Sequence, residues 1–139
     1  MPDLNGQDDA ASASRIVLVV DDSRLARMVV GNALGRLRPD WAVRQAGNAD
    51  EALDVLGAER IDIAFIDFNM PGTDGLALAA ELRNRWPNMP VAVISANVQD
   101  DIIARARALD AAFMAKPLTD DALVAFLSGA ALRLRRVPR

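Results

Sequence analysis

Short apolar runs alternate with segments of helical period along most of the chain. Two runs, Ile16–Val20 and Val91–Ser95, are almost wholly apolar, as expected of strands buried on both faces. The segments 41–46, 61–67 and 111–115 also have the length and composition of strands. Five segments that follow these strands carry apolar residues at three- and four-residue spacing, which is typical of amphipathic helices.

The five predicted helices are bounded by capping and helix-breaking residues. Ser23, Asp74 and Thr119 begin three of them, and Pro39 and Pro87 end two. The predicted apolar rows are Leu25, Met28, Val29, Ala33 and Leu37; Ala49, Ala52, Leu53 and Leu56; Leu78, Leu82 and Trp86; Val98, Ile102, Ala106 and Leu109; and Leu123, Phe126, Leu127, Ala130, Ala131 and Leu134.

Five βα units with short connections predict an α/β fold, in which a parallel sheet carries helices on both faces. The 139 residues suit one domain. We expect that domain at residues 15–135, after a polar, disordered lead-in at 1–14 and before a short basic tail at 136–139.

Composition excludes several function classes. The chain has neither cysteine nor histidine, which removes disulfides, Cys nucleophiles, Ser-His-Asp machinery and histidine-ligated zinc. No apolar run reaches the ~20 residues of a membrane span, and no export signal is present, so a cytoplasmic protein is expected. A net charge of −3 gives no bias toward nucleic acid.

Chemistry-bearing residues lie where the predicted strands end. Asp21 and Asp22 follow the first strand, Asp67 ends the third, Ser95 ends the fourth, and Lys116 follows the fifth. Lys116 is the only lysine among sixteen basic residues. Ligands of open α/β sheets bind beyond the carboxyl ends of the strands, so these side chains should converge at one edge.

The predicted cluster suits phosphoryl transfer. Crowded carboxylates repel one another unless a hard cation lies among them, and oxygen ligands with open water positions favour Mg²⁺. A lysine beside them can bind a phosphoryl oxygen as a point charge. A carboxylate acceptor, a divalent ion, an ammonium group and a hydroxyl together therefore indicate a phosphoryl-transfer site.

These residues and their neighbours resemble a response-regulator receiver domain over residues 15–135. The motifs that carry the resemblance are Val-Val-Asp21-Asp22-Ser, Phe65-Ile-Asp67-Phe-Asn69-Met-Pro71-Gly-Thr-Asp74-Gly75, Ser95-Ala96 and Phe113-Met-Ala-Lys116-Pro117. The stand-alone, CheY-like type is the expected form, because no output domain follows in the sequence. The resemblance implies a flavodoxin-like (βα)5 fold with strand order 2-1-3-4-5, an order that is a known property of CheY.

The resemblance also implies the roles of the site residues. Asp67 would be the phospho-acceptor, and Lys116 would pair with its phosphorylated form. Mg²⁺ would be held by Asp22, Asp67 and the backbone carbonyl of Asn69, with Asp21 acting through water. The protein would then be a response regulator of a bacterial two-component system or phosphorelay, modifying itself without turning over a separate substrate.

Two further residues would form the switch. Ser95 would bind a phosphoryl oxygen, and Phe113 would turn inward, changing the face made by the helix at 98–109, the strand at 111–115 and the last helix. Phe113 has no hydroxyl, so it would act by packing alone. Family members often have a cis peptide bond at the position of Lys116–Pro117. The segment 108–112 lacks the Gly-Ala pair common in the family, so a different turn is expected there.

The implied partners are a histidine kinase or histidine phosphotransfer protein and a downstream protein target that the sequence does not name. Neither nucleic acid nor membrane insertion is expected. A monomer is expected, with dimer formation on phosphorylation as an alternative.

Other interpretations stay open at this stage. A haloacid-dehalogenase-like phosphatase would also use Asp67 as nucleophile, but it needs a second acid where this chain has Asn69, and no cap insertion is recognisable. A receiver cut from a larger hybrid kinase would show the same motifs. A nucleotide-binding flavodoxin-like module would need a glycine-rich phosphate loop after the first strand, where Asp21 and Asp22 stand instead.

Overall fold

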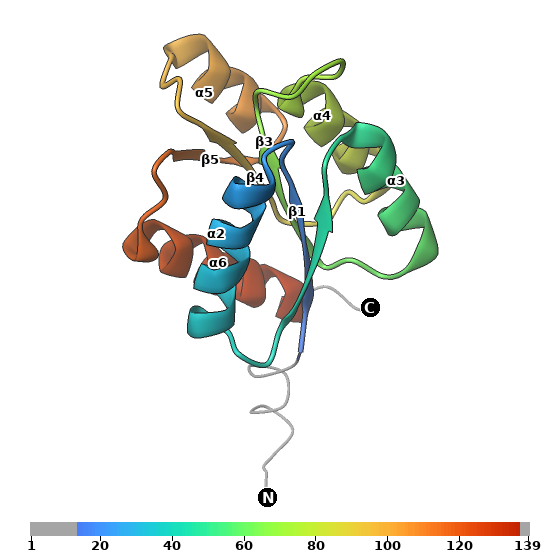
Figure 1. The fold of residues 1–139 in the computed structure, drawn as a ribbon, viewed down its shortest axis with the longest axis vertical. Coiled ribbons are helices and arrows are strands. Elements are labelled where there is room, and N and C mark those ends of the chain that lie inside the picture. The colour runs from blue at the N-terminus through green and yellow to red at the C-terminus, as the bar shows by residue number, and fades with distance from the viewer. Residues whose placement is uncertain (1–13, 137–139) are drawn as a thin grey trace, which may run out of the picture.

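A computed structural model describes residues 14–136 as one parallel sheet covered by helices on both faces (Figure 1). The elements in chain order are β1 (Ile16–Val20), α2 (Arg24–Leu37), β2 (Ala42–Ala46), α3 (Ala49–Ala58), β3 (Ile63–Asp67), α4 (Gly75–Arg85), β4 (Val91–Ser95), α5 (Asp100–Ala108), β5 (Ala112–Ala115) and α6 (Asp120–Arg136). Residues 1–13 of the expected disordered lead-in and residues 137–139 of the expected basic tail lie outside the described residues.

The strand order is β2-β1-β3-β4-β5, which confirms the predicted topology. All four neighbouring pairs are parallel, so every strand ends at the same edge of the sheet. The register places Val20 beside Ile66 and Ser95 beside Ala115. The residues that end or follow these strands therefore lie side by side along the carboxyl edge of the sheet.

Two cores lie on opposite faces of the sheet. Apolar side chains of α3, α4 and α5 pack on one face against residues such as Val20 and Ile66. Those of α2 and α6 pack on the other against Val19 and Phe65. Burial on both sides explains why β1, β3 and β4 are almost continuously apolar.

The predicted helix positions are largely confirmed. Ser23 and Asp74 accept hydrogen bonds from the first turns of α2 and α4, and Thr119 does so at the start of α6. Three strands begin one or two residues later than predicted, at Ala42, Ile63 and Ala112. The helix α5 begins at Asp100, so the predicted member Val98 lies in the loop before it.

The first half of the apolar row predicted for α2 is wrong in phase. Leu25, Met28 and Val29 are 71%, 46% and 57% exposed, whereas the buried residues are Val30, Ala33 and Leu34. Both sets have helical spacing, and only the position of the sheet decides which one is buried. The predicted Ala33 is buried and the predicted Leu37 is partly buried against the same core, and the other helices bury most of the residues predicted for them.

The segment before β5 forms a turn without glycine. Asp110 takes a left-handed conformation with φ of 56°, which asparagine and aspartate tolerate better than most residues. The Arg83 guanidinium donates hydrogen bonds to the carbonyl oxygens of Leu109 and Asp110 at 2.9 Å each. After β5, the Lys116–Pro117 peptide bond is cis, which the sequence had left open. Among residues 14–136, no helix has the length and apolar character needed to span a membrane.

Candidate phosphoryl-acceptor and metal site

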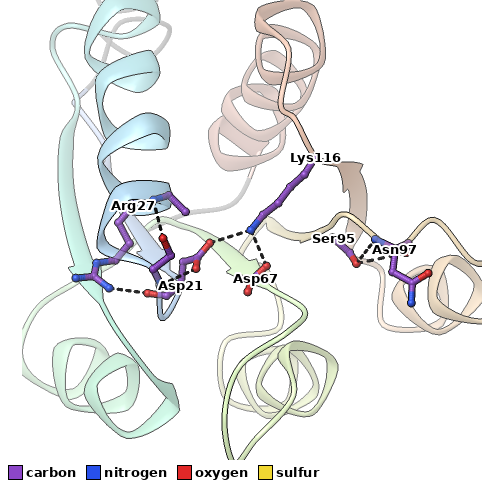
Figure 2. Close-up of polar contacts among 8 residues, drawn as sticks. Asp21, Arg27, Asp67, Ser95, Asn97 and Lys116 are labelled. Atoms are coloured by element: carbon purple, nitrogen blue, oxygen red, sulfur yellow. Dashed lines mark hydrogen bonds and ion pairs between the residues drawn. The ribbon is translucent and has the colours of Figure 1, made fainter.

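The carboxyl edge of the sheet brings together all the residues predicted for the site from the strand ends. Asp21 and Asp22 follow β1, Asp67 is the last residue of β3, Ser95 is the last of β4, and Lys116 follows β5. Figure 2 shows the Lys116 side chain reaching across from the end of β5 toward Asp67 and Asp21. Four strands therefore supply one group of polar side chains.

Three carboxylates form a compact acidic cluster. Asp21, Asp22 and Asp67 each offer an oxygen, and these oxygens lie within 4.8 Å of one another. Asp21 and Asp67 are each only 5% exposed, whereas Asp22 is exposed. Carboxylate oxygens at this spacing fit a hard divalent cation such as Mg²⁺, which binds through a few carboxylates and retains water ligands.

Lys116 is the cation of the cluster. Its Nζ lies 3.0 Å from Asp67 Oδ1 and 3.2 Å from Asp21 Oδ2. Burial opposes the charge of this ammonium group, but the hydrogen bonds and negative charges of Asp67 and Asp21 outweigh it and raise the pKa of Lys116. Lys116 is thus firmly charged and aimed at the predicted acceptor.

Asp67 responds differently to the same ion pair. Burial raises the pKa of its carboxyl group, the hydrogen bond from Lys116 lowers it, and the charges of Asp21 and Asp22 raise it again, with a net upward shift. The attraction between the two groups is mutual, but for Asp67 burial and two like charges together outweigh it. A bound cation would relieve this repulsion.

The backbone after Asp67 is fixed by close packing of the next helix. Phe68 N–H donates to Ile94 O at 2.8 Å, and Gly75 N–H donates to Phe68 O at 2.9 Å. A Cβ at Gly75 would lie 2.3 Å from the carbonyl oxygen of Asp67, closer than any real contact. Only glycine therefore allows α4 to begin so near Asp67. The loop between them carries the exposed Asn69 two residues after Asp67.

Ser95 and Phe113 lie on the side of the site toward β5. The Ser95 hydroxyl accepts a hydrogen bond from Asn97 N–H at 2.9 Å and lies 3.3 Å from Asn97 O (Figure 2). Lys116 N–H donates to Ser95 O at 3.0 Å, which joins the ends of β4 and β5. Phe113, in β5, is half-buried against the core that contains α5.

Two residues that contribute to this site were not predicted from the sequence. Gly75 stands out only as part of the motif after Asp67, although its missing side chain is what allows α4 to pack there. Arg27 belongs to no motif, yet its Nη1 donates to Asp21 O at 2.6 Å. Its spacing of six residues from Asp21 places it at the end of the first turn of α2, which is the only signal in the sequence.

Comparisons with known proteins agree with this geometry. Residues 17–128 match the response regulator receiver domain family. The sensor histidine kinase RcsC of Salmonella typhi is 33% identical over 124 residues, which cover 87% of this chain and 13% of that protein. A response regulator from Thermotoga maritima is 32% identical with a TM-score of 0.76, covering 86% of this chain and 98% of that one. TrrA of Thermotoga maritima, solved in complex with Mg²⁺-BeF, shares the fold with 24% identity and a TM-score of 0.73, covering 84% and 98%.

The chain therefore belongs to the response regulator receiver domain family, whose members act in two-component systems. The phosphatase interpretation of the sequence is not favoured by these comparisons.

Proposed function

We propose that Asp67 accepts a phosphoryl group from a phosphohistidine on a histidine kinase or histidine phosphotransfer protein, in a reaction that depends on Mg²⁺. The observation that carries the proposal is the buried carboxylate of Asp67, 3.0 Å from the only lysine and within 4.8 Å of two further carboxylates. An Asp67 oxygen bonds to phosphorus as the phosphorus–nitrogen bond of the donor breaks. The product is an acyl phosphate on this chain, with no turnover of a separate substrate.

The acidic cluster supplies the metal ligands in this proposal. Asp22, Asp67 and the backbone carbonyl of Asn69 would hold Mg²⁺, and Asp21 would act through a bound water. When bound, the ion neutralises the charge that accumulates between the carboxylates and the incoming phosphoryl oxygens. TrrA, which has this fold, was solved with Mg²⁺-BeF, and that complex supports the assignment.

Lys116 and Ser95 would bind the phosphorylated product. Phosphorylation adds ~1.5–2 negative charges, and the Lys116 ammonium is already within contact distance of the acceptor. The Ser95 hydroxyl would exchange its contacts with Asn97 for a phosphoryl oxygen and draw the β4–α5 loop toward Asp67. Phe113 would then move inward and alter the face formed by α5, β5 and α6, where the downstream protein target would bind.

The exposed apolar residues of α2 support docking of a protein donor. Leu25, Met28 and Val29 lie in the first two turns of α2, directly after the acidic pair, and are all at least 46% exposed. A protein that brings its phosphohistidine to Asp67 must cover this edge of the sheet. We propose that these three residues, the donor face, contact it. The protein would work in the cytoplasm as a monomer, without nucleic acid.

The test is phosphorylation by acetyl phosphate with Mg²⁺, followed by intact-mass spectrometry. We expect one phosphoryl group that is stable in acid and labile in base, with none in Asp67→Asn. Asp54→Asn is the matched control, because it removes an exposed carboxylate on α3 and should label fully. Full labelling of Asp67→Asn would refute the assignment of the acceptor.

A further inference from the structure

All the polar groups of Asp21 are held by hydrogen bonds. Its N–H donates to Ala46 O at 3.1 Å, and its Oδ1 accepts from Ser23 N–H at 2.9 Å. Its Oδ2 contacts Lys116, and its carbonyl oxygen accepts from Arg27 Nη1 at 2.6 Å. The first three contacts are made by the neighbouring strand β2, by the turn before α2 and by the residue that follows β5. The contact to the carbonyl oxygen is the one made by a side chain of α2.

The Arg27 guanidinium is itself held in place from the neighbouring strand. Its Nε donates to Gln45 Oε1 at 3.0 Å, so the side chain bridges α2 and β2. A Cβ at Gly47 would lie 3.4 Å from Arg27 Nη1, which shows that the guanidinium packs closely against that backbone. Because one planar group donates in two directions, its orientation is fixed.

The carbonyl of Asp21 belongs to the peptide plane that also carries Asp22. Fixing that oxygen fixes the plane, and with it the positions of the Asp22 amide nitrogen and Cα from which the side chain extends. Within residues 14–136, the exposed Asp22 carboxylate accepts no hydrogen bond, so its own side chain has no other support. Its position near Asp67 therefore depends on the backbone.

We propose that Arg27, oriented by Gln45, is a positioning residue that holds the Asp21–Asp22 peptide so that Asp22 faces the metal ion. This inference rests on the proposed Mg²⁺ site and adds two residues that act on it without touching the ion.

The charge of Arg27 and its proposed positioning role predict opposite changes in Mg²⁺ affinity when the residue is replaced. Removing a cation near three carboxylates should, by Coulomb attraction alone, tighten Mg²⁺ binding. Releasing the Asp21–Asp22 peptide should instead weaken it, as loss of outer-shell partners of metal ligands commonly does by 10–100-fold. The sign of the change in affinity therefore separates the two effects.

The experiment measures the Mg²⁺ dissociation constant by calorimetry for the wild type, Arg27→Gln, Gln45→Met and Arg24→Gln. We expect Arg27→Gln to bind about tenfold more weakly, at the lower end of the range for outer-shell partners. Gln45→Met, which removes the acceptor without changing charge, should weaken binding by a smaller factor. Arg24→Gln removes the same charge from an exposed position on α2 and should bind as the wild type or slightly more tightly.

A second measurement needs no metal. In EDTA, amide hydrogen exchange at Asp22 and Ser23 should be faster in Arg27→Gln than in the wild type. Unchanged or tighter Mg²⁺ binding by Arg27→Gln would overturn the inference, as would unchanged exchange at these amides. If Arg27→Gln does not fold, the test uses Gln45→Met, because Gln45 lies at an exposed position of β2. Mg²⁺ binding by Gln45→Met with wild-type affinity would then overturn the inference. A wild type that binds no Mg²⁺ would instead refute the proposed metal site itself.

Discussion

Replacing Asp67 by Asn removes one charge from the acidic cluster, and we expect the metal-free protein to become more stable. At an effective dielectric constant of ~20, two carboxylates at 4.8 Å, the upper limit of the separations in this cluster, repel by about 3.5 kcal/mol. The ammonium of Lys116 at 3.0 Å attracts Asp67 by about 5.5 kcal/mol on the same scale. Asp67 faces two such repulsions and one attraction, so the charges alone leave a net cost of about 1–2 kcal/mol. Burial of the carboxylate adds to that cost.

The pH dependence follows from the raised pKa of Asp67, which burial causes first and the neighbouring carboxylates reinforce. A folded-state pKa above the unfolded value means that the native state binds this proton more tightly. The associated stability is present below pH ~4 and is lost as the pH rises through the folded pKa. Asp67→Asn lacks this titration, so its advantage over the wild type in EDTA should grow between pH 4 and pH 7.

Urea unfolding at low salt checks both expectations. At pH 7 in EDTA, Asp67→Asn should be more stable by about 1–2 kcal/mol, equivalent to several degrees in Tm for a domain of this size. Asp54→Asn, which removes an exposed charge outside the cluster, should match the wild type. A variant less stable than the wild type at pH 7 would show that the ion pair with Lys116 outweighs repulsion and burial, and would refute the reasoning.

Four other changes test the remaining parts of the site. Millimolar Mg²⁺ should raise the Tm of the wild type more than that of Asp22→Ala, since binding only to the native state stabilises it, and equal shifts would exclude the acidic cluster as the metal site. Lys116→Ala and Lys116→Arg should keep the fold but lose the amide NMR shift changes across α5, β5 and α6 that beryllofluoride, a phosphoryl mimic, induces in the wild type. If both variants retained the full pattern of shift changes, Lys116 would be a surface lysine only. Gly75→Ala should destabilise the protein by about 1–3 kcal/mol in urea and slow acetyl phosphate labelling, because the added Cβ displaces the Asp67 carbonyl; unchanged values would contradict the packing argument. Val29→Asp should slow phosphotransfer from a cognate kinase about tenfold, as loss of ~1.4 kcal/mol of apolar contact would, and should leave acetyl phosphate labelling unchanged. If the kinase phosphorylated the variant and the wild type at equal rates, α2 would not be part of the donor face.

The strand ends were predictable from the sequence because topology alone brings them together. An acid that ends or follows an apolar strand must lie at the carboxyl edge of a parallel sheet, whatever the details of packing. Asp67 and Lys116 are 49 positions apart in the numbering and still meet at 3.0 Å. The contacts between side chains were not predictable in this way. The bond from Arg27 to Gln45 joins two elements through rotamers that no periodicity encodes, and Ser95 bonds to Asn97 rather than capping α5.

The wrong phase predicted for α2 has its own physical cause. The helical period does not distinguish Val29 from Val30, because each belongs to an apolar row. One row is Leu25, Met28 and Val29, and the other is Val30, Ala33 and Leu34. A helix with two apolar rows can bury either one, and the choice depends on how the chain leaves β1. Asp21 and Ser23 form a tight turn there, with the Ser23 N–H bonded to Asp21 Oδ1. That turn sets the start of the helix and hence which row faces the sheet.

The apolar row that α2 leaves exposed bears on how the proposed acceptor site would select a protein donor. A groove of about 580 Å³ lies beside Trp86 and Leu134, and none of the three clustered carboxylates lines it. In the proposed function, the donor face would supply contact area for a protein donor, because the fold leaves these apolar side chains exposed. On this proposal, a small phosphoryl donor would need only the carboxylates, the cation and Lys116, whereas a kinase would need the donor face as well. The two rates would therefore depend on different residues of the same chain.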